Sequence, residues 1–438
     1  MTETRVADAA RFDEIVQNEF WSARSELAHI KAFAHARMCS PWAVLAVVLT
    51  RIACTVPPNV VLPPIVGGDG GLNLFAGLVG PSGSGKSGAI NAARDAVVTE
   101  GFPTVPLGSG EGISRSYAYR STKTQQLVWL ERSVLFTATE VDALSALDGR
   151  QGATLGAQMR EMFNGGELGF GYASVEKRVI LPEHSYRAGV IVGIQPGRAA
   201  VLLDGEAGGM PQRFLFMPST DPTIPRYPDP APTIWTPPRM HWAAPRNNPF
   251  PEGEADTGRA VGPREELWVD PLIVDGIQKA AHQRATGIGQ PLDGHALLVR
   301  LKVAAALSVL AGRKMIRDHD WDLAGTVMAV SDTTRLAMQA QLENARTAIS
   351  ERLGTAEGIR RATADEVSAL HTEVRIAGAI TKKLQTPPAP GMLWSRSALR
   401  KTFAYRDRDT FDTVLTDMFN SPQDLTNAQM AAATRIAS

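Results

Sequence analysis

A parallel α/β fold is predicted for residues 67–217 of this chain, and two observations predict it. Apolar runs of strand length alternate with amphipathic helical stretches through residues 72–217, a pattern typical of a parallel sheet covered by helices. In addition, a glycine-rich stretch, Gly80–Ser87, stands between one such strand and the helix that follows it. The 438 residues are enough for two or three domains.

Composition shifts divide the rest of the chain. They predict a helical N-terminal region at 1–66, the α/β core at 67–217, a proline-rich connector at 218–265, a helical region at 266–350 and a helical C-terminal region at 351–438. Within the first region, the apolar run at 40–58 is predicted to be a buried helix, with Ser40 as N-cap and Pro41 at its first position.

Charge and cysteine content exclude several classes of protein. The 45 basic and 45 acidic residues balance, so any nucleic-acid surface must be local or assembled from several copies. The two cysteines, Cys39 and Cys54, argue against a disulfide framework or a zinc site and favour a reducing cytoplasm. The first residues do not resemble a signal peptide, and Arg51 interrupts the most apolar run, so no membrane partner is expected.

The stretch Gly80-Pro81-Ser82-Gly83-Ser84-Gly85-Lys86-Ser87 has the spacing G-x-x-x-x-G-K-[ST]. We call it the phosphate loop. Glycines at these positions let backbone N–H groups turn inward toward phosphate oxygens, and the following helix N-terminus adds partial positive charge. Lys86 is expected to reach the β- and γ-phosphates, and the Ser87 hydroxyl to bind Mg²⁺. Binding of ATP with Mg²⁺ is therefore predicted.

The strand at 132–144 carries the next candidates. Glu140 follows apolar residues at the carboxyl end of a parallel strand, where it can polarise the water that attacks the γ-phosphate. An ordinary surface carboxylate is the alternative. Asp142 is a second candidate ligand for the metal. Thr139 stands where an aspartate is usual, which weakens the case for fast hydrolysis more than the case for binding.

Further along, two short strands at 167–183 are predicted to form a hairpin, with Lys177 and Arg178 next to its turn. A buried strand then ends at Gln195, whose amide can hold water or a phosphate oxygen. Arg213 precedes another apolar strand.

In this order, the motifs resemble AAA+ ATPases, and among them the minichromosome-maintenance helicase branch. The phosphate loop corresponds to Walker A and the strand with Glu140 and Asp142 to Walker B. Gln195-Pro196 stands where the branch has Asn-Pro, and Gln212–Phe214 where it has Ser-Arg-Phe. The helical stretch that contains "HALLVRLKVAAALSVLAGRKMIRDHDWDLAGTVM" is similar to the lid. The chain also resembles a poorly characterised family of actinobacterial and phage replication proteins.

The resemblance implies roles for these residues. The resemblance assigns Gln195 the role of sensor 1. It assigns Arg213 the role of an arginine finger directed at a neighbouring subunit; the alternative is a purely structural arginine. Arg300 is the candidate for sensor 2, deeper in its helix than is usual, with a salt-bridged residue on the helix surface as the alternative. His295 is a weaker candidate. Lys177 and Arg178 face the pore of a hexameric ring and grip DNA, unless the hairpin tip is only solvated.

The expected function is thus an ATP-dependent, ring-forming DNA helicase or translocase in phage or mobile-element replication, acting on single- or double-stranded DNA with a separate primase or loader. Two alternatives stay open: a slowly hydrolysing, nucleotide-switched DNA-binding initiator, and a P-loop small-molecule kinase. Residues 395–419 read as two short helices of a helix-turn-helix or winged-helix module, with Arg396, Arg400, Lys401 and Arg406 as a basic face, or as a packing tail.

Overall fold

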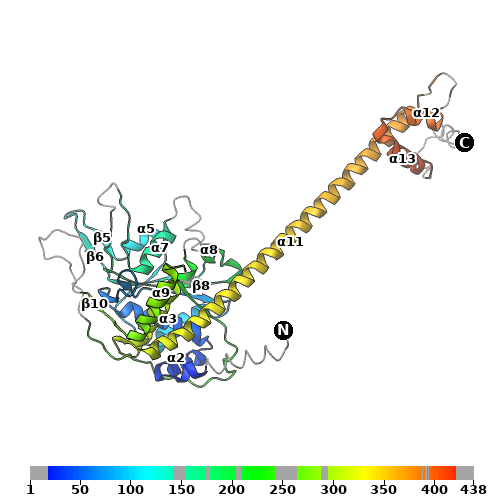
Figure 1. Cartoon of the computed structure of the whole chain (residues 1–438). Coiled ribbons are helices and arrows are strands. Elements are labelled where there is room, and N and C mark those ends of the chain that lie inside the picture. The colour runs from blue at the N-terminus through cyan, green and yellow to red at the C-terminus, as the bar shows by residue number, and fades with distance from the viewer. Residues whose placement is uncertain are drawn as a thin grey trace. The chain divides into compact units, whose positions relative to one another are not determined.

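The computed structural model contains two compact units, Met1–Ala345 and Arg346–Ser438. Figure 1 shows its helices and strands. The described residues are 18–141, 154–172, 178–203, 209–242, 264–287, 294–386, 388–389, 392 and 394–420.

The first unit is built on a five-stranded, all-parallel sheet with the order β4-β7-β8-β3-β9. Its strands are β4 Thr104–Pro106, β7 Ser133–Ala138, β8 Arg187–Ile194, β3 Leu74–Val79 and β9 Phe214–Pro218. Every residue of β3 and β8 is buried, as expected for central strands of a parallel sheet. The predicted parallel α/β fold is therefore confirmed.

The order of the strands separates the two chemical motifs. β3, which leads into the phosphate loop, pairs with β8, and β8 pairs with β7, which leads to Glu140. β8 therefore lies between them, so Gln195 follows the strand that separates the loop from the carboxylate. Gly193 in β8 lets the chain after β7 pass close to β8, because a Cβ at this position would run into the carbonyl of Thr139.

Helices and small strands surround this sheet. The helices of the core are α4 Lys86–Ala96, α5 Gly110–Arg115, α7 Leu155–Asn164 and α8 Ala200–Leu203. Two strands, β5 Ala118–Arg120 and β6 Leu127–Trp129, form an antiparallel pair. The described part of the connector is hydrogen-bonded to the core at Trp235, whose backbone N–H donates to the carbonyl of Ala96 at the end of α4.

The N-terminal region is helical only in part. It contains α2 Ser25–Ala36 and α3 Pro41–Thr55. Helix α3 begins as predicted, because the Ser40 side chain accepts a hydrogen bond from the N–H of Ala43 and Pro41 opens the helix. The prediction of helix through residue 66 is wrong at its end. β1 Val60–Leu62 pairs with β2 Gly70–Gly71 and with β10 Glu265–Glu266.

Helix α3 is the central helix of the core. Nearly all of its side chains are buried, and it packs against β3, β8, α4 and α10. An apolar helix of this kind is stable only when it is covered on several sides. The N-terminal region is therefore part of the core of the first unit.

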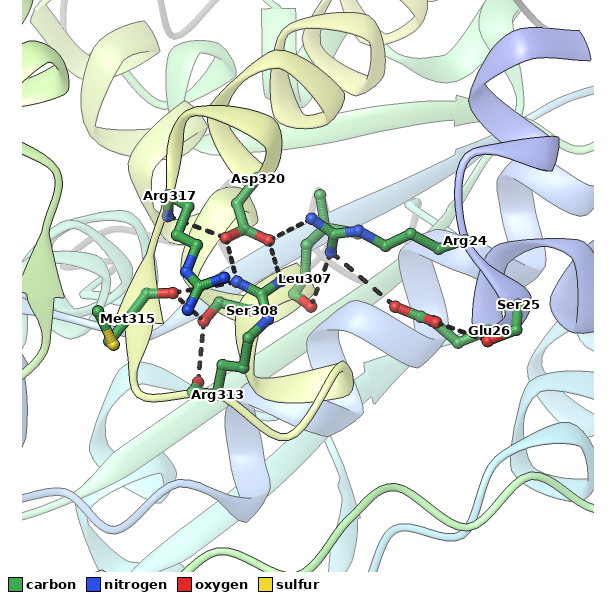
Figure 2. Close-up of polar contacts among 9 residues, drawn as sticks. All are labelled: Arg24, Ser25, Glu26, Leu307, Ser308, Arg313, Met315, Arg317 and Asp320. Carbon is green, nitrogen blue, oxygen red and sulfur yellow. Dashed lines mark hydrogen bonds and ion pairs between the residues drawn. The ribbon is translucent and has the colours of Figure 1, made fainter.

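The predicted lid region begins with β11 Trp268–Val269, α9 Pro271–Ala285, α10 Gly294–Leu310 and β12 Met315–Ile316. It continues into α11 Asp318–Leu384, a single helix that passes through the predicted boundary at residue 350. Within the first unit, a buried carboxylate, Asp320, fixes the start of α11 (Figure 2). It accepts hydrogen bonds from Arg24 at 2.6 Å, from Arg313 at 2.7 and 2.8 Å, and from the N–H of Arg317 at 2.9 Å.

The second unit has a small core of its own. Ile376 and Ile380 of α11 pack with Leu399 of α12 Arg396–Lys401 and with Phe411 of α13 Arg408–Asn420. Ser395 caps α12 by accepting a hydrogen bond from the N–H of Ala398. Across the described parts of the chain, no helix combines the length and the apolar character needed to cross a bilayer.

Candidate functional site

The phosphate loop connects β3 to α4. Its backbone depends on glycine for two reasons. Gly83 and Gly85 have φ of +77° and +82°, which side-chain-bearing residues rarely adopt. Gly80 has an ordinary φ, but a Cβ there would collide with the hydroxyls of Ser84 and Ser219. These two hydroxyls are 2.6 Å apart, so Ser219, at the end of β9, holds the loop from one side.

Lys86 is the first residue of α4, and its side chain bends back over the loop. The ammonium donates to the carbonyls of Gly80 at 2.8 Å and Pro81 at 2.7 Å. Partial burial lowers the pKa of Lys86, and the nearby Glu140 carboxylate opposes that change. The lysine, the loop and Glu140 thus belong to one electrostatic site.

Glu140 and Gln195 meet at the carboxyl edge of the sheet, as their places after β7 and β8 predicted. The Gln195 amide Nε2 donates to Glu140 Oε1 at 3.4 Å. Glu140 is exposed and Gln195 is half-buried. An exposed carboxylate beside an amide can accept a proton from water while the amide orients that water.

The residues present fit Mg²⁺ bound together with phosphate. Ser87 lies in the exposed first turn of α4, where free N–H groups and the helix dipole favour anions. Among the described residues, no three His, Cys, Asp or Glu side chains gather into a metal cage. Mg²⁺ usually binds through few protein ligands together with phosphates and water, so Ser87 suits this role. Asp142, the other predicted ligand, lies outside the described residues.

A cavity of about 710 Å³ adjoins the phosphate loop. Gly80 and Pro81 form part of its wall, and Asp221, Thr333 and Met338 form other parts. Sequence reasoning missed Ser219, Asp221 and Thr333. They come from the connector and from α11, far from any motif, and no local signal in the sequence marks them.

Arg213 and Arg300 do not join the phosphate loop in this structure. Arg213 is 6% exposed, precedes the amino end of β9, and donates to the carbonyl of Gly209 at 2.6 Å. It therefore lies at the opposite sheet edge from the loop. Its burial favours the structural role over an arginine finger, which has to project from the surface.

Arg300 of α10 is held against Trp321 of α11. Its guanidinium lies 4.0 Å from the centre of the Trp321 ring and donates twice to the Trp321 carbonyl, at 3.1 and 2.9 Å. Burial lowers its pKa, and Asp322 opposes this effect. These contacts fit a structural role. His295, the weaker candidate for sensor 2, lines a second cavity together with Gln212 and Arg284.

The predicted nucleic-acid contacts are described only in part. Leu168 and Leu181 form the antiparallel bridge of the expected hairpin, while Lys177 at its turn lies outside the described residues. Arg178 donates twice to the carbonyl of Tyr172, at 3.1 and 2.7 Å, so its guanidinium is directed back onto its own hairpin.

Acidic residues offset the predicted basic face of the C-terminal helices. Arg396 and Arg400 both pair with Asp412 of α13, at 3.4 and 2.6 Å. Arg406 lies 3.9 Å from Asp407. These pairs reduce the positive potential that nucleic-acid binding requires, and they favour the packing tail.

No protein-family model matches this chain, and no curated protein matches it either.

Proposed function

We propose that this chain is a Mg²⁺-dependent P-loop ATPase. One observation carries the proposal: β8 brings Gln195 between the phosphate loop and Glu140, and Gln195 and Glu140 are within hydrogen-bond distance. A strand–loop–helix that binds phosphate, with a carboxylate and an amide at the same sheet edge, provides the groups that hydrolysis of a nucleoside triphosphate needs.

Each residue has a distinct task in this mechanism. The loop N–H groups and Lys86 bind the phosphate oxygens, and Lys86 gives up its contacts to Gly80 and Pro81 to do so. Ser87 would hold Mg²⁺, which would supply positive charge beside the phosphates. Glu140 accepts a proton from the attacking water, and Gln195 orients that water.

The fuller proposal is a ring-forming helicase or translocase that acts on DNA in phage or mobile-element replication. It is supported by the order of the motifs along the sequence, which resembles the minichromosome-maintenance branch of AAA+ ATPases. The hexameric ring and the pore contacts of Lys177 and Arg178 belong to this proposal, in which Arg178 would give up its hydrogen bonds to the Tyr172 carbonyl to reach DNA. Arg213 is left out of the catalytic set because of its burial.

A second candidate is a slowly hydrolysing, nucleotide-switched DNA-binding initiator. Thr139 favours it, because this exposed hydroxyl stands where an aspartate usually helps to hold the metal. Both candidates bind ATP in the same site, and they differ in turnover and in its response to DNA.

The test measures ATP binding and ATPase activity of the full chain, with and without single-stranded DNA. Lys86→Ala should greatly weaken binding, since it removes the charge that reaches the phosphates. Glu140→Gln should bind ATP normally and lose about 10²–10⁴-fold in turnover. Glu100→Gln, an exposed carboxylate away from the site, is the matched control.

The outcomes separate the candidates. Turnover that DNA stimulates supports the helicase, and DNA binding with slow, unstimulated turnover supports the initiator. Unchanged ATP affinity in a folded Lys86→Ala protein would overturn the ATPase itself.

A further inference from the structure

The part of α11 that belongs to the second unit contains a long stretch of solvent-exposed residues. Every residue from 346 to 371 is exposed. Gly354 and Gly358 lie within it, and a Cβ at either position would meet nothing within 4 Å. Interior glycines cost a helix about 1 kcal/mol each, and helices in proteins take most of their stability from packing. A helix with this composition calls for a partner surface.

An apolar stripe runs along this stretch with heptad spacing. Its positions alternate in steps of four and three residues. They are Ile349, Leu353, Ala356, Arg360, Thr363, Val367, Leu370 and Val374. The large apolar members are 49–66% exposed. Single exposed apolar residues are ordinary, but a seam of them at heptad spacing is typical of helices that pair in a coiled coil.

The seam is symmetric about its own midpoint, which lies between Arg361 and Ala362. Ile349 and Val374 are equally far from that point, and so are Leu353 and Leu370, Ala356 and Val367, and Arg360 and Thr363. When two identical helices pair around a twofold axis in opposite directions, residues at equal distances from the midpoint face each other. Each apolar position then meets an apolar position of the second copy.

Charge also favours this direction. In the antiparallel arrangement Arg352 flanks the seam opposite Glu373 of the second copy, and the twofold axis repeats the pair. A parallel arrangement would instead set the two Arg360 side chains against each other within the seam. Flanking charges and polar seam residues determine the direction and register of coiled coils.

From the symmetric seam and the complementary charges we infer that residues 349–374 of α11 form an antiparallel coiled coil with a second copy of this chain. The twofold axis passes through the midpoint between Arg361 and Ala362. This interface is independent of the proposed ATPase activity, because it uses none of the residues of the phosphate-loop site.

The first experiment measures self-association of the full-length chain without nucleotide by sedimentation. Ala356→Asp places a charge in the seam, and Ala369→Asp places the same charge on the outward side of the same helix. The seam variant should associate about tenfold or more weakly than the outward one, because it buries an unpaired carboxylate. A chain that is monomeric throughout, or equal association of the two variants, would overturn the inference.

The second experiment tests direction by disulfide formation. A mixture of Leu353→Cys and Leu370→Cys proteins should cross-link on oxidation, whereas Leu353→Cys alone should not exceed the unsubstituted chain, whose Cys39 and Cys54 are buried. Cross-linking of Leu353→Cys alone would overturn the antiparallel arrangement. Arg352→Glu should weaken association, and adding Glu373→Arg in the same chain should restore it. Failure of that rescue would overturn the predicted pairing.

Discussion

Among the substitutions considered in the first unit, we expect that of Asp320 to lower the free energy of unfolding most. Asp320→Asn keeps the shape of the side chain and removes its charge. The side chain is fully buried between Arg24 and Arg313, whose side chains are 10% and 24% exposed. Removing one member of a buried ion pair costs about 3–5 kcal/mol, because the remaining charges lose their compensation. Water can still reach Arg313 in part, so we expect a loss of about 3–4 kcal/mol in the free energy of unfolding.

The pH dependence follows from the same contacts. Burial alone raises the pKa of Asp320, but hydrogen bonds from Arg313, the N–H of Arg317 and Arg24 outweigh it, so the pKa lies below its usual value. A carboxylate with a lowered pKa stabilises the folded state above its unfolded pKa of about 4 and loses that contribution as pH falls through the folded value. The difference between the native chain and Asp320→Asn should therefore shrink below about pH 4.

Urea unfolding followed by tryptophan fluorescence measures this effect, since Trp321 is adjacent in the sequence. Asp332→Asn is the matched control. It lies on the same helix, 53% exposed, and pairs with Arg335 at 3.1 Å, so its loss should cost at most about 1 kcal/mol. A loss below about 1 kcal/mol for Asp320→Asn would refute the reasoning. If that variant does not fold, Arg24→Gln provides the same comparison from the other side of the pair.

Two further predictions concern the first unit. Gly80→Ala should weaken ATP binding about tenfold or more, because the added Cβ displaces Ser84 and Ser219 and distorts the phosphate loop. Calorimetric titration with ATP measures this affinity, and an unchanged affinity would contradict the prediction. Arg213→Ala should lower the melting temperature, because a buried charged hydrogen bond to Gly209 is worth about 1.5–3 kcal/mol. A mixture of the Arg213→Ala and Glu140→Gln proteins should have no more ATPase activity than the two proteins have separately. A higher activity of the mixture would assign Arg213 a role in a neighbouring subunit.

Local patterns in the sequence predicted the centre of the site. The phosphate loop depends on residues within one turn, and Glu140 and Gln195 follow from the rule that parallel strands end at one edge. The roles of Arg213 and Arg300 depend on burial and on distant carbonyls, which spacing along the chain does not reveal. Composition placed a boundary at residue 350, yet α11 Asp318–Leu384 continues through it.

The pair Arg24–Asp320 also has a consequence for synthesis of the chain. Its two residues are 296 positions apart. At about 5–20 residues per second, a ribosome needs about 15–60 s to go from one to the other. During that time α3, which is apolar on nearly all sides, has emerged before α10, one of the helices that cover it, exists. We therefore expect nascent chains of intermediate length to bind chaperones that recognise apolar segments, and to release them only after residue 320 has left the ribosome.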